Sequence, residues 1–217
     1  MLRDRKLRGK IMRNKSLVIA QFGVLLSIEA IFCFTPLGSL PALGPIVMTL
    51  ALIPVVITTI ILGTEAGSLM GFFAGLFSFI VWTFVPPNPL VAFVFTPFYP
   101  LGEYTGNFLS VLICFVPRIL VGTVTGITYT FLKKKWPEMK KTNVAISAIL
   151  GSMTNTIGVL GGIWIFFGSI YSDLFGVAML AIVTGLVLTN GIPEAILTAI
   201  TSVALNRFIR KEENDNQ

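Results

Sequence analysis

The stretch FLSVLICFVPRILVGTVTGITYTFLKKK, residues 108–135, is apolar over most of its length and ends in three lysines. About 20 consecutive apolar residues are enough for a helix to cross the hydrocarbon core of a bilayer. Arg118 interrupts the stretch directly after Pro117. Because a guanidinium at this depth costs at least ~2.5 kcal/mol on insertion scales, it normally faces a partner or a hydrated cavity. The stretch therefore predicts a transmembrane helix whose arginine faces a partner or a hydrated cavity.

The other basic residues have a simpler explanation than Arg118. Of the sixteen Lys and Arg residues, all but Arg118 fall in three clusters, at 3–15, 133–141 and 207–211. Each cluster flanks an apolar stretch, where Lys and Arg mark the cytoplasmic side and meet anionic headgroups. The net charge of +6 is thereby assigned to the membrane surface, and no nucleic-acid partner is expected.

Composition places the chain among polytopic membrane proteins. Hydrophobic residues make up 54% of the 217 residues and charged residues only 12%, whereas soluble domains carry about 25% charged residues. No signal-peptide cleavage pattern precedes the first apolar stretch, so no processing is expected. The predicted fold is an all-α membrane protein with six transmembrane helices, and the predicted localisation is the cell membrane.

The chain divides into a basic cytoplasmic tail (1–15), a six-helix transmembrane domain (16–209) and a polar cytoplasmic tail (210–217). The expected spans cover residues 16–34, 43–63, 66–84, 107–132, 143–168 and 176–208. The last is long for one crossing, and Gly191 and Pro193 offer a place for a break.

An even number of spans puts both termini on one side of the membrane. The three basic clusters then share that side, while the opposite loops, 35–42, 85–106 and 169–175, contain no Lys or Arg. The positive-inside rule therefore predicts cytoplasmic termini. It also places the long Pro- and aromatic-rich loop 85–106, between the third and fourth spans, outside the cell, and loops of this length are usually functional.

Polar residues in the last three spans converge on one depth. Arg118, Asn155 and Asn190 lie at similar distances along their spans, near the middle of the bilayer. Glu194 follows Asn190 by four residues and therefore shares its helix face. These groups could line a polar cavity. Alternatively, Arg118 and Glu194 could form a buried structural pair, with the asparagines bonding across helices.

Other candidate residues lie in the first span and the long loop. Glu29 faces either the same cavity or the interface. Phe98 and Tyr99, with the other loop aromatics, could cover a ligand or form an interfacial belt. Gly23 and Ser27 present small residues four apart, which let another helix approach closely. Gly67, Gly71 and Gly75 form a similar ridge in the third span, which we expect to pack within the bundle.

The absence of several motifs argues against an enzyme. The chain has no phosphate-binding loop of the form GxxxxGK[ST], no HExxH and no nucleophile elbow. It has no histidine, which removes histidine-based metal sites and hydrolytic triads. Cys33 and Cys114 lack a metal-binding or disulfide spacing. No cofactor or metal is expected.

Three short motifs, taken in order, resemble a known family. They are PRILVG at 117–122, GSMTNT at 151–156 and Asn190-Gly191-x-x-Glu194. With the length, the six spans and the long loop before the fourth span, they resemble the substrate-binding S components of energy-coupling factor (ECF) vitamin transporters. The segments LPALGPIVMT at 40–49 and IPVV at 53–56 resemble the pantothenate branch of that family.

This resemblance implies a function and partners. An S component binds a small vitamin with high affinity from the outside, associates with a transmembrane coupling subunit and two cytoplasmic ATPases, and topples to release the vitamin inside. It implies substrate-binding roles for Arg118, Asn155, Asn190 and Glu194, and a docking role for the surface of the first span, here Gly23 and Ser27. Other vitamins remain alternatives, namely pyrimidine or pyridoxine compounds and riboflavin, as does a stand-alone facilitator or channel.

Overall fold

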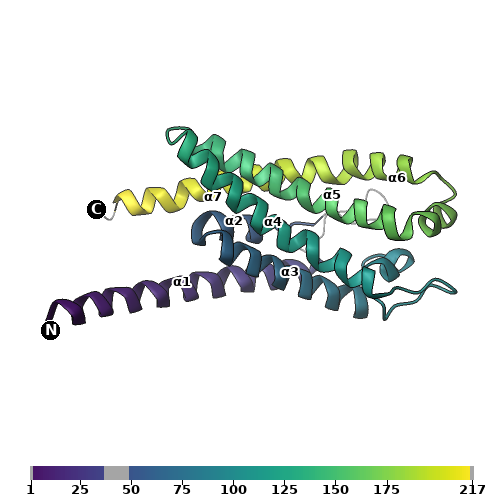
Figure 1. Cartoon of the computed structure of the whole chain (residues 1–217), viewed down its shortest axis with the longest axis horizontal. Helices are drawn as coiled ribbons and strands as arrows, with labels where there is room; N and C mark the ends of the chain where they lie inside the picture. The colour runs from purple at the N-terminus through teal and green to yellow at the C-terminus, as the bar shows by residue number, and fades with distance from the viewer. Residues whose placement is uncertain (1, 37–48, 216–217) are drawn as a thin grey trace.

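The computed structural model describes residues 2–36 and 49–215, and within these ranges the chain is a helical bundle (Figure 1). An isolated β bridge joins Leu101 and Tyr104. The elements are α1 (Leu2–Phe34), α2 (Leu52–Leu62), α3 (Thr64–Phe84), the 3₁₀ helix η2 (Pro89–Val94), α4 (Phe108–Lys135), α5 (Lys140–Phe175), α6 (Met179–Leu186), the π-helix η3 (Val187–Gly191) and α7 (Ile192–Asp215). The all-α prediction is confirmed.

Five stretches of helix are long and apolar enough to cross a membrane. They are Lys15–Phe34, Thr64–Phe84, Phe108–Lys135, Lys140–Phe175 and Met179–Asn206. Five of the six predicted spans therefore correspond to a helix of crossing length. For the remaining span, predicted at 43–63, the structure has the 11-residue helix α2, which begins only at Leu52. Residues 49–51 are described and are not helical, and residues 43–48 lie outside the described ranges.

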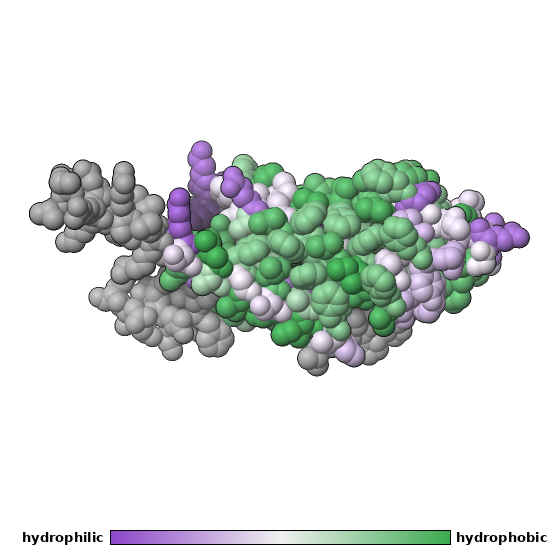
Figure 2. Space-filling model, turned by 90° about the horizontal axis from the view of Figure 1, so that it is seen from below, coloured by the Kyte–Doolittle hydropathy of each residue, from purple (hydrophilic) through white to green (hydrophobic). Residues whose placement is uncertain are grey.

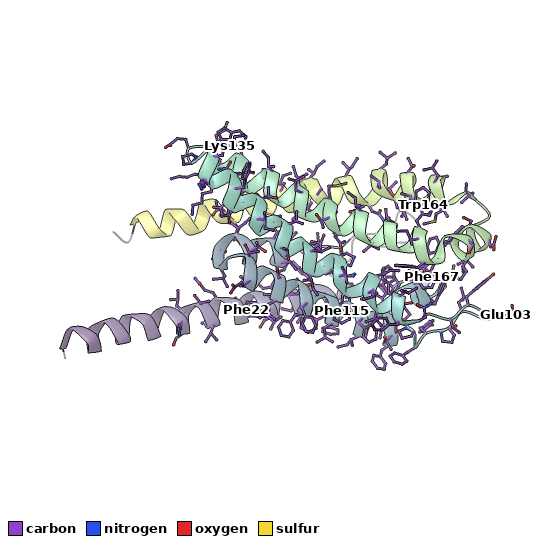
Figure 3. All side chains as sticks on the ribbon, in the orientation of Figure 1. Phe22, Glu103, Phe115, Lys135, Trp164 and Phe167 are labelled. Atoms are coloured by element: carbon purple, nitrogen blue, oxygen red, sulfur yellow. The ribbon has the colours of Figure 1, made fainter. Side chains whose placement is uncertain are left out.

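The surface of the bundle has the pattern expected for a membrane protein. Figure 2 shows hydrophobic residues across the middle of the visible face and hydrophilic residues towards its two ends. The ends of α1 and α7 that carry the chain termini project from the same end of the bundle (Figure 1), which also holds Lys135, while Glu103 lies at the other end (Figure 3). Basic residues and the long loop thus occupy opposite ends.

Glycines bring α3 and α4 into close contact. A Cβ added to Gly122 of α4 would lie 2.3 Å from the carbonyl carbon of Gly67, and one added to Gly71 would lie 2.2 Å from the Arg118 carbonyl oxygen. Gly75 faces Phe115 of α4 in the same way. The expected packing of this glycine ridge within the bundle is confirmed, and it fixes the backbone of α4 at Arg118.

Several predicted loops are shorter than expected. The segment 169–175, expected as a loop, is the last part of α5, which ends only at the left-handed Gly176. The lysines of the expected loop 133–141 belong to the last turn of α4 and the first turn of α5. The two terminal tails are also helical within residues 2–15 and 210–215. In each case the helix extends beyond the run of apolar residues from which its span was predicted. The ends of these helices are polar because they lie outside the hydrophobic band of the membrane.

At the place where a break was considered possible, the last span has a π-turn, and the helix continues through it. The π-helix η3 ends at Gly191, and α7 begins with Ile192 and Pro193. Proline cannot donate the backbone hydrogen bond that a continuous helix would need there, and π-turns inside helices often occur at functional sites. α6, η3 and α7 therefore form one interrupted transmembrane segment.

The long loop 85–106 folds into the bundle instead of lying over it. Residues 91–94 of its 3₁₀ helix η2 are buried, and the Ser110 hydroxyl donates to the Phe93 carbonyl at 2.8 Å. Phe93 and Phe95 are almost fully buried, in a cluster with Trp82 of α3 and residues of α5. Phe93 is a core residue, so the expected choice between a ligand cover and an interfacial belt was wrong for it. Phe95 is buried as well and also lines the cavity described below.

Candidate functional site

A cavity opens between α1, α3, α4, α5 and the interrupted last segment. Its volume, measured as the space open to the centres of water-sized spheres, is about 110 Å³. One water molecule needs about 10–15 Å³ on the same measure. The cavity is therefore large enough for a small organic molecule. The described residues that line it are Phe32, Cys33, Thr49, Ser78, Val81, Trp82, Pro87, Phe95, Arg118, Asn155, Thr156, Val159, Leu160, Leu186, Asn190, Gly191 and Glu194.

Arg118 supplies the positive charge of the cavity from α4. The residue before it, Pro117, cannot donate the usual helical hydrogen bond, and Gly158 of α5 leaves room for the proline ring, since a Cβ there would lie 2.9 Å from it. The Arg118 guanidinium donates through Nη1 to the carbonyl oxygen of Cys114, one turn earlier, at 2.5 Å. A guanidinium has five N–H donors, so most of its donor capacity is available to a ligand.

Asn155, Asn190 and Glu194 face Arg118 from α5 and the last segment. Asn190 belongs to η3 and Glu194 to the first turn of α7, so the π-turn places both side chains on the cavity. Gly191 permits this approach to α5, because a Cβ there would lie 2.7 Å from the Thr156 methyl group. Arg118 and these three residues all line the same cavity, as expected.

Two of these polar side chains carry buried oxygen atoms without a partner. Asn155 Oδ1 and Glu194 Oε1 accept no hydrogen bond from the described residues. Buried polar atoms are rarely left unpaired, and each orphaned one costs about 1–3 kcal/mol. Unpaired acceptors that line a cavity are positioned to receive hydrogen bonds from hydroxyl or amide donors of a bound molecule.

The arrangement around Arg118 differs from a closed salt bridge. Among the described residues, no carboxylate oxygen lies within 4.0 Å of the Arg118 guanidinium. The structural pairing of Arg118 with Glu194, considered above, is therefore not formed here. A free guanidinium in an apolar environment is suited to bind an anion in a charge-assisted, bidentate manner.

The remaining predicted site residues lie elsewhere. Glu29 is fully buried but does not line the cavity; its neighbours Phe32 and Cys33 do. Phe98 is 69% exposed and its ring contacts Phe79, while Tyr99 packs against the buried cluster around η2. Neither aromatic reaches the cavity.

The apolar wall of the cavity was for the most part not predicted from the sequence. Trp82 of α3 and Phe95 of the long loop stack with ring centroids 4.5 Å apart and form part of this wall. Thr49, Ser78 and Thr156 add hydroxyl groups. Trp82 sits in an otherwise apolar span, where an aromatic ring has many uses, and the position of Phe95 depends on the fold of the loop. No sequence signal singles out Trp82, and Phe95 was expected only as one of several loop aromatics that could cover a ligand.

Comparison with known proteins agrees with this geometry. Residues 15–205 match the family model described as "ECF transporter, substrate-specific component". The chain is also 33% identical over 173 residues to the "Pantothenic acid transporter PanT" of Lactococcus lactis subsp. cremoris (strain MG1363), an alignment that covers 79% of this chain and 82% of the relative. Both matches confirm the resemblance carried by the motifs in α4, α5 and the last segment. The chain belongs to the family of substrate-specific components of ECF transporters.

Proposed function

We propose that this chain is the pantothenate-capturing S component of an ECF transporter. As a member of this family, it is a multi-pass membrane protein that works with ECF module subunits in vitamin uptake. The observation that carries the choice of substrate is a free guanidinium, Arg118, in one cavity with unpaired oxygen acceptors on Asn155 and Glu194. Similarity to a pantothenic acid transporter supports the same substrate.

The chemistry of pantothenate matches the walls of the cavity. Its carboxylate would pair with Arg118, and its two hydroxyl groups and amide N–H would donate to Asn155 and Glu194. Its dimethyl-substituted carbon would lie against the apolar wall of Trp82 and Phe95. A site built to hydrogen-bond specific groups discriminates strongly against analogues that lack them, because its own polar atoms are then left unpaired.

The topology proposed for this function has six spans with both termini in the cytoplasm. The basic clusters support this orientation, because the end of the bundle that carries the chain termini also carries the lysines of the α4–α5 connection (Figure 3). We assign α2 to the second span. The long loop and the α5–α6 connection would then lie outside the cell.

The proposed partners are a transmembrane coupling subunit and two cytoplasmic ATPases. The outer surface of α1 supports this part of the proposal. Gly23 has no atom within 4 Å of where a Cβ would lie, and the exposed Ser27 hydroxyl donates back to the Gly23 carbonyl at 2.9 Å. This small-residue surface is thus open to a second helix. Between residues 16 and 34, most other exposed side chains of α1 are apolar and suited to lipid.

Binding by the purified chain tests the proposed substrate. Isothermal titration calorimetry in detergent or nanodiscs should give a pantothenate Kd below about 1 μM without ATP. Pantothenol, which replaces the carboxylate by a hydroxymethyl group, should bind at least about tenfold more weakly. Mass spectrometry of the copurified small molecule should identify pantothenate. Equal affinity for both compounds, or a different copurified vitamin, would contradict the assignment.

Transport assays test the proposed partners. In proteoliposomes, uptake of labelled pantothenate should require the coupling and ATPase subunits together with ATP. Uptake by the isolated chain without ATP would instead indicate a facilitator.

A further inference from the structure

Phe95 is an aromatic residue of the long loop 85–106 that is both almost fully buried and in the lining of the cavity. Its ring stacks on that of Trp82 in α3, with an angle of 25° between the ring planes. The two rings together present one apolar surface to the cavity. Because Phe95 follows directly after the 3₁₀ helix η2, the position of this surface depends on how the loop is attached to the bundle.

Two threonines attach the loop to α3 beside the stacked rings. The hydroxyl oxygens of Thr83 and Thr96, each one residue after a ring, lie 2.7 Å apart. Thr83 also donates to the Phe79 carbonyl at 2.7 Å, and the Phe98 amide donates to Thr96 Oγ1 at 3.3 Å. A hydroxyl has only one hydrogen to donate, so all these bonds are satisfied when Thr96 donates to Thr83. We call this contact between Thr83 and Thr96 the threonine bridge.

Ser110, in the first turn of α4, holds the other end of the loop segment 93–96. Its hydroxyl donates to the Phe93 carbonyl at 2.8 Å and accepts from the Asn107 amide at 3.1 Å. Gly106 permits this close approach, because a Cβ there would collide with two carbonyl oxygens of the segment. The segment that carries the Phe95 ring is therefore hydrogen-bonded to α3 at one end and to α4 at the other.

We infer that the threonine bridge and Ser110 fix Phe95 against Trp82 before a ligand binds, and that this preformed wall makes the cavity selective for a branched apolar group. This inference rests on the proposed function, in which the dimethyl-substituted carbon of pantothenate lies against the wall. The described residues that line the cavity do not include Thr83 or Thr96. The two threonines act on the ligand through Phe95 and are thus positioning residues.

A fixed wall and a movable wall respond differently to a ligand that is too small. Removing methyl groups leaves a gap, and the penalty is larger when the surroundings cannot collapse into it. Pantothenate should therefore bind the wild-type chain at least about tenfold more tightly than the analogue with hydrogen atoms in place of its two methyl groups. A wall that can move should give a smaller ratio of the two affinities.

Removal of one hydroxyl tests the threonine bridge. Thr83→Val keeps nearly the same shape but takes the acceptor away from Thr96, so the affinity ratio should fall by about 3- to 10-fold. Thr83→Ser keeps the hydroxyl and should keep most of the wild-type ratio. Thr184→Val is the control, because the exposed Thr184 hydroxyl donates to the Leu180 carbonyl within α6. An unchanged ratio in Thr83→Val, or an equal fall in Thr184→Val, would overturn the inference.

A double variant separates positioning from stability. Thr83→Val leaves the buried Thr96 hydroxyl without its acceptor, which lowers the stability of the fold. Thr83→Val/Thr96→Val removes both polar partners and should regain much of the thermal stability. Its affinity ratio should stay reduced, because the directional bond is still missing. A double variant that regains the wild-type ratio together with the stability would show that the bridge has only a structural role.

Hydrogen exchange on the ligand-free wild-type chain tests whether the wall is preformed. The amides of Phe95 and Thr96 donate to the Ala92 carbonyl at 2.9 and 3.2 Å. They should exchange at least about tenfold more slowly than those of the exposed turn at residues 102–103, and pantothenate should add little protection. Protection that appears only with pantothenate bound would indicate a movable cover and overturn the inference.

The outcomes also separate this inference from the proposed function. Failure of the wild-type chain to bind pantothenate would overturn the proposed function itself, whereas hydrogen exchange of the free chain would still report on the wall. Wild-type binding with an unchanged ratio in Thr83→Val would overturn only the role of the threonine bridge in selectivity.

Discussion

Arg118 is the residue on which the proposed site depends. It lies outside the three basic clusters and faces a cavity with unpaired acceptors. Within residues 2–36 and 49–215, its guanidinium donates only to groups of Cys114 in its own helix. An arginine that served only to staple helices would be paired with a carboxylate. The environment of Arg118 is instead suited to bind an anion.

Replacing Arg118 should abolish recognition of the ligand's carboxylate. A hydrogen bond to a charged group contributes about 1.5–3 kcal/mol, so Arg118→Ala should weaken pantothenate binding by roughly 10- to 150-fold. Arg118→Lys keeps the charge but not the planar fork, so it should lose less. Calorimetry with pantothenate and pantothenol measures both effects, and pantothenol affinity should fall much less.

The fold of the Arg118 variants must be checked separately. Arg118→Ala removes the cation from the lining of the cavity, which also contains Glu194, so its thermal unfolding should be compared with that of Arg118→Ala/Glu194→Gln. If only the single variant unfolds and the double variant regains stability without binding, the ligand-binding role stands. If the double variant binds pantothenate like the wild type, Arg118 would be a structural partner of Glu194.

At the residue level the sequence predicted the polar half of the site and not its apolar half. Arg118, Asn155, Asn190 and Glu194 could be found because polar groups are rare in transmembrane helices and their depth follows from counting residues. Trp82 could not, since apolar residues fill every span. Phe98, Tyr99 and Glu29 were expected at the site, and the structure places them away from the cavity surface.

The crossing of α3 and α4 is the element that holds Arg118 in place. Gly122 packs directly on the Gly67–Ser68 backbone, and a backbone cannot shift as a flexible side chain can. Gly122→Ala should therefore lower the stability of the fold by about 1–3 kcal/mol through overpacking. It should also weaken pantothenate binding. Thermal unfolding in detergent and calorimetry measure the two effects.

Gly161 offers a matched control on α5. A Cβ at this position meets no atom within 4 Å, and alanine is a better helix former than glycine. Gly161→Ala should therefore be neutral or slightly stabilising. Equal effects of the two substitutions would show that helix propensity, and not the close approach of α3 and α4, determines the outcome at Gly122.

Helices that are defined by a run of apolar residues were predicted well. Elements whose position depends on tertiary contacts were predicted poorly. The spans at α3, α4 and α5 were recognised from runs of apolar residues, and the interruption before Pro193 from backbone chemistry. The buried 3₁₀ helix η2 was not recognised, because its position depends on a hydrogen bond from Ser110 to the Phe93 carbonyl, seventeen residues away. Local sequence does not encode that contact.

On the scale of the whole molecule, α1 is the helix least attached to the bundle. Only 6% of its membrane-spanning window is buried, against 33–50% for the other candidate spans. A helix that buries so little within its own chain has most of its surface available to lipid and to other proteins. The open Gly23–Ser27 surface lies on this helix, away from Glu29 and the cavity.

A bulky substitution on α1 should therefore impair docking to the partner subunits without impairing pantothenate binding. Gly23→Ile fills the small-residue surface and should reduce copurification with the coupling and ATPase subunits by at least about tenfold. Pantothenate binding to the isolated chain should persist, because a Cβ at Gly23 contacts nothing within the bundle.

Ile165→Trp, at a 76% exposed position on α5, is the control for added bulk on a lipid-facing surface. If both variants lose the partners equally, or if Gly23→Ile loses pantothenate instead, α1 is not the docking helix.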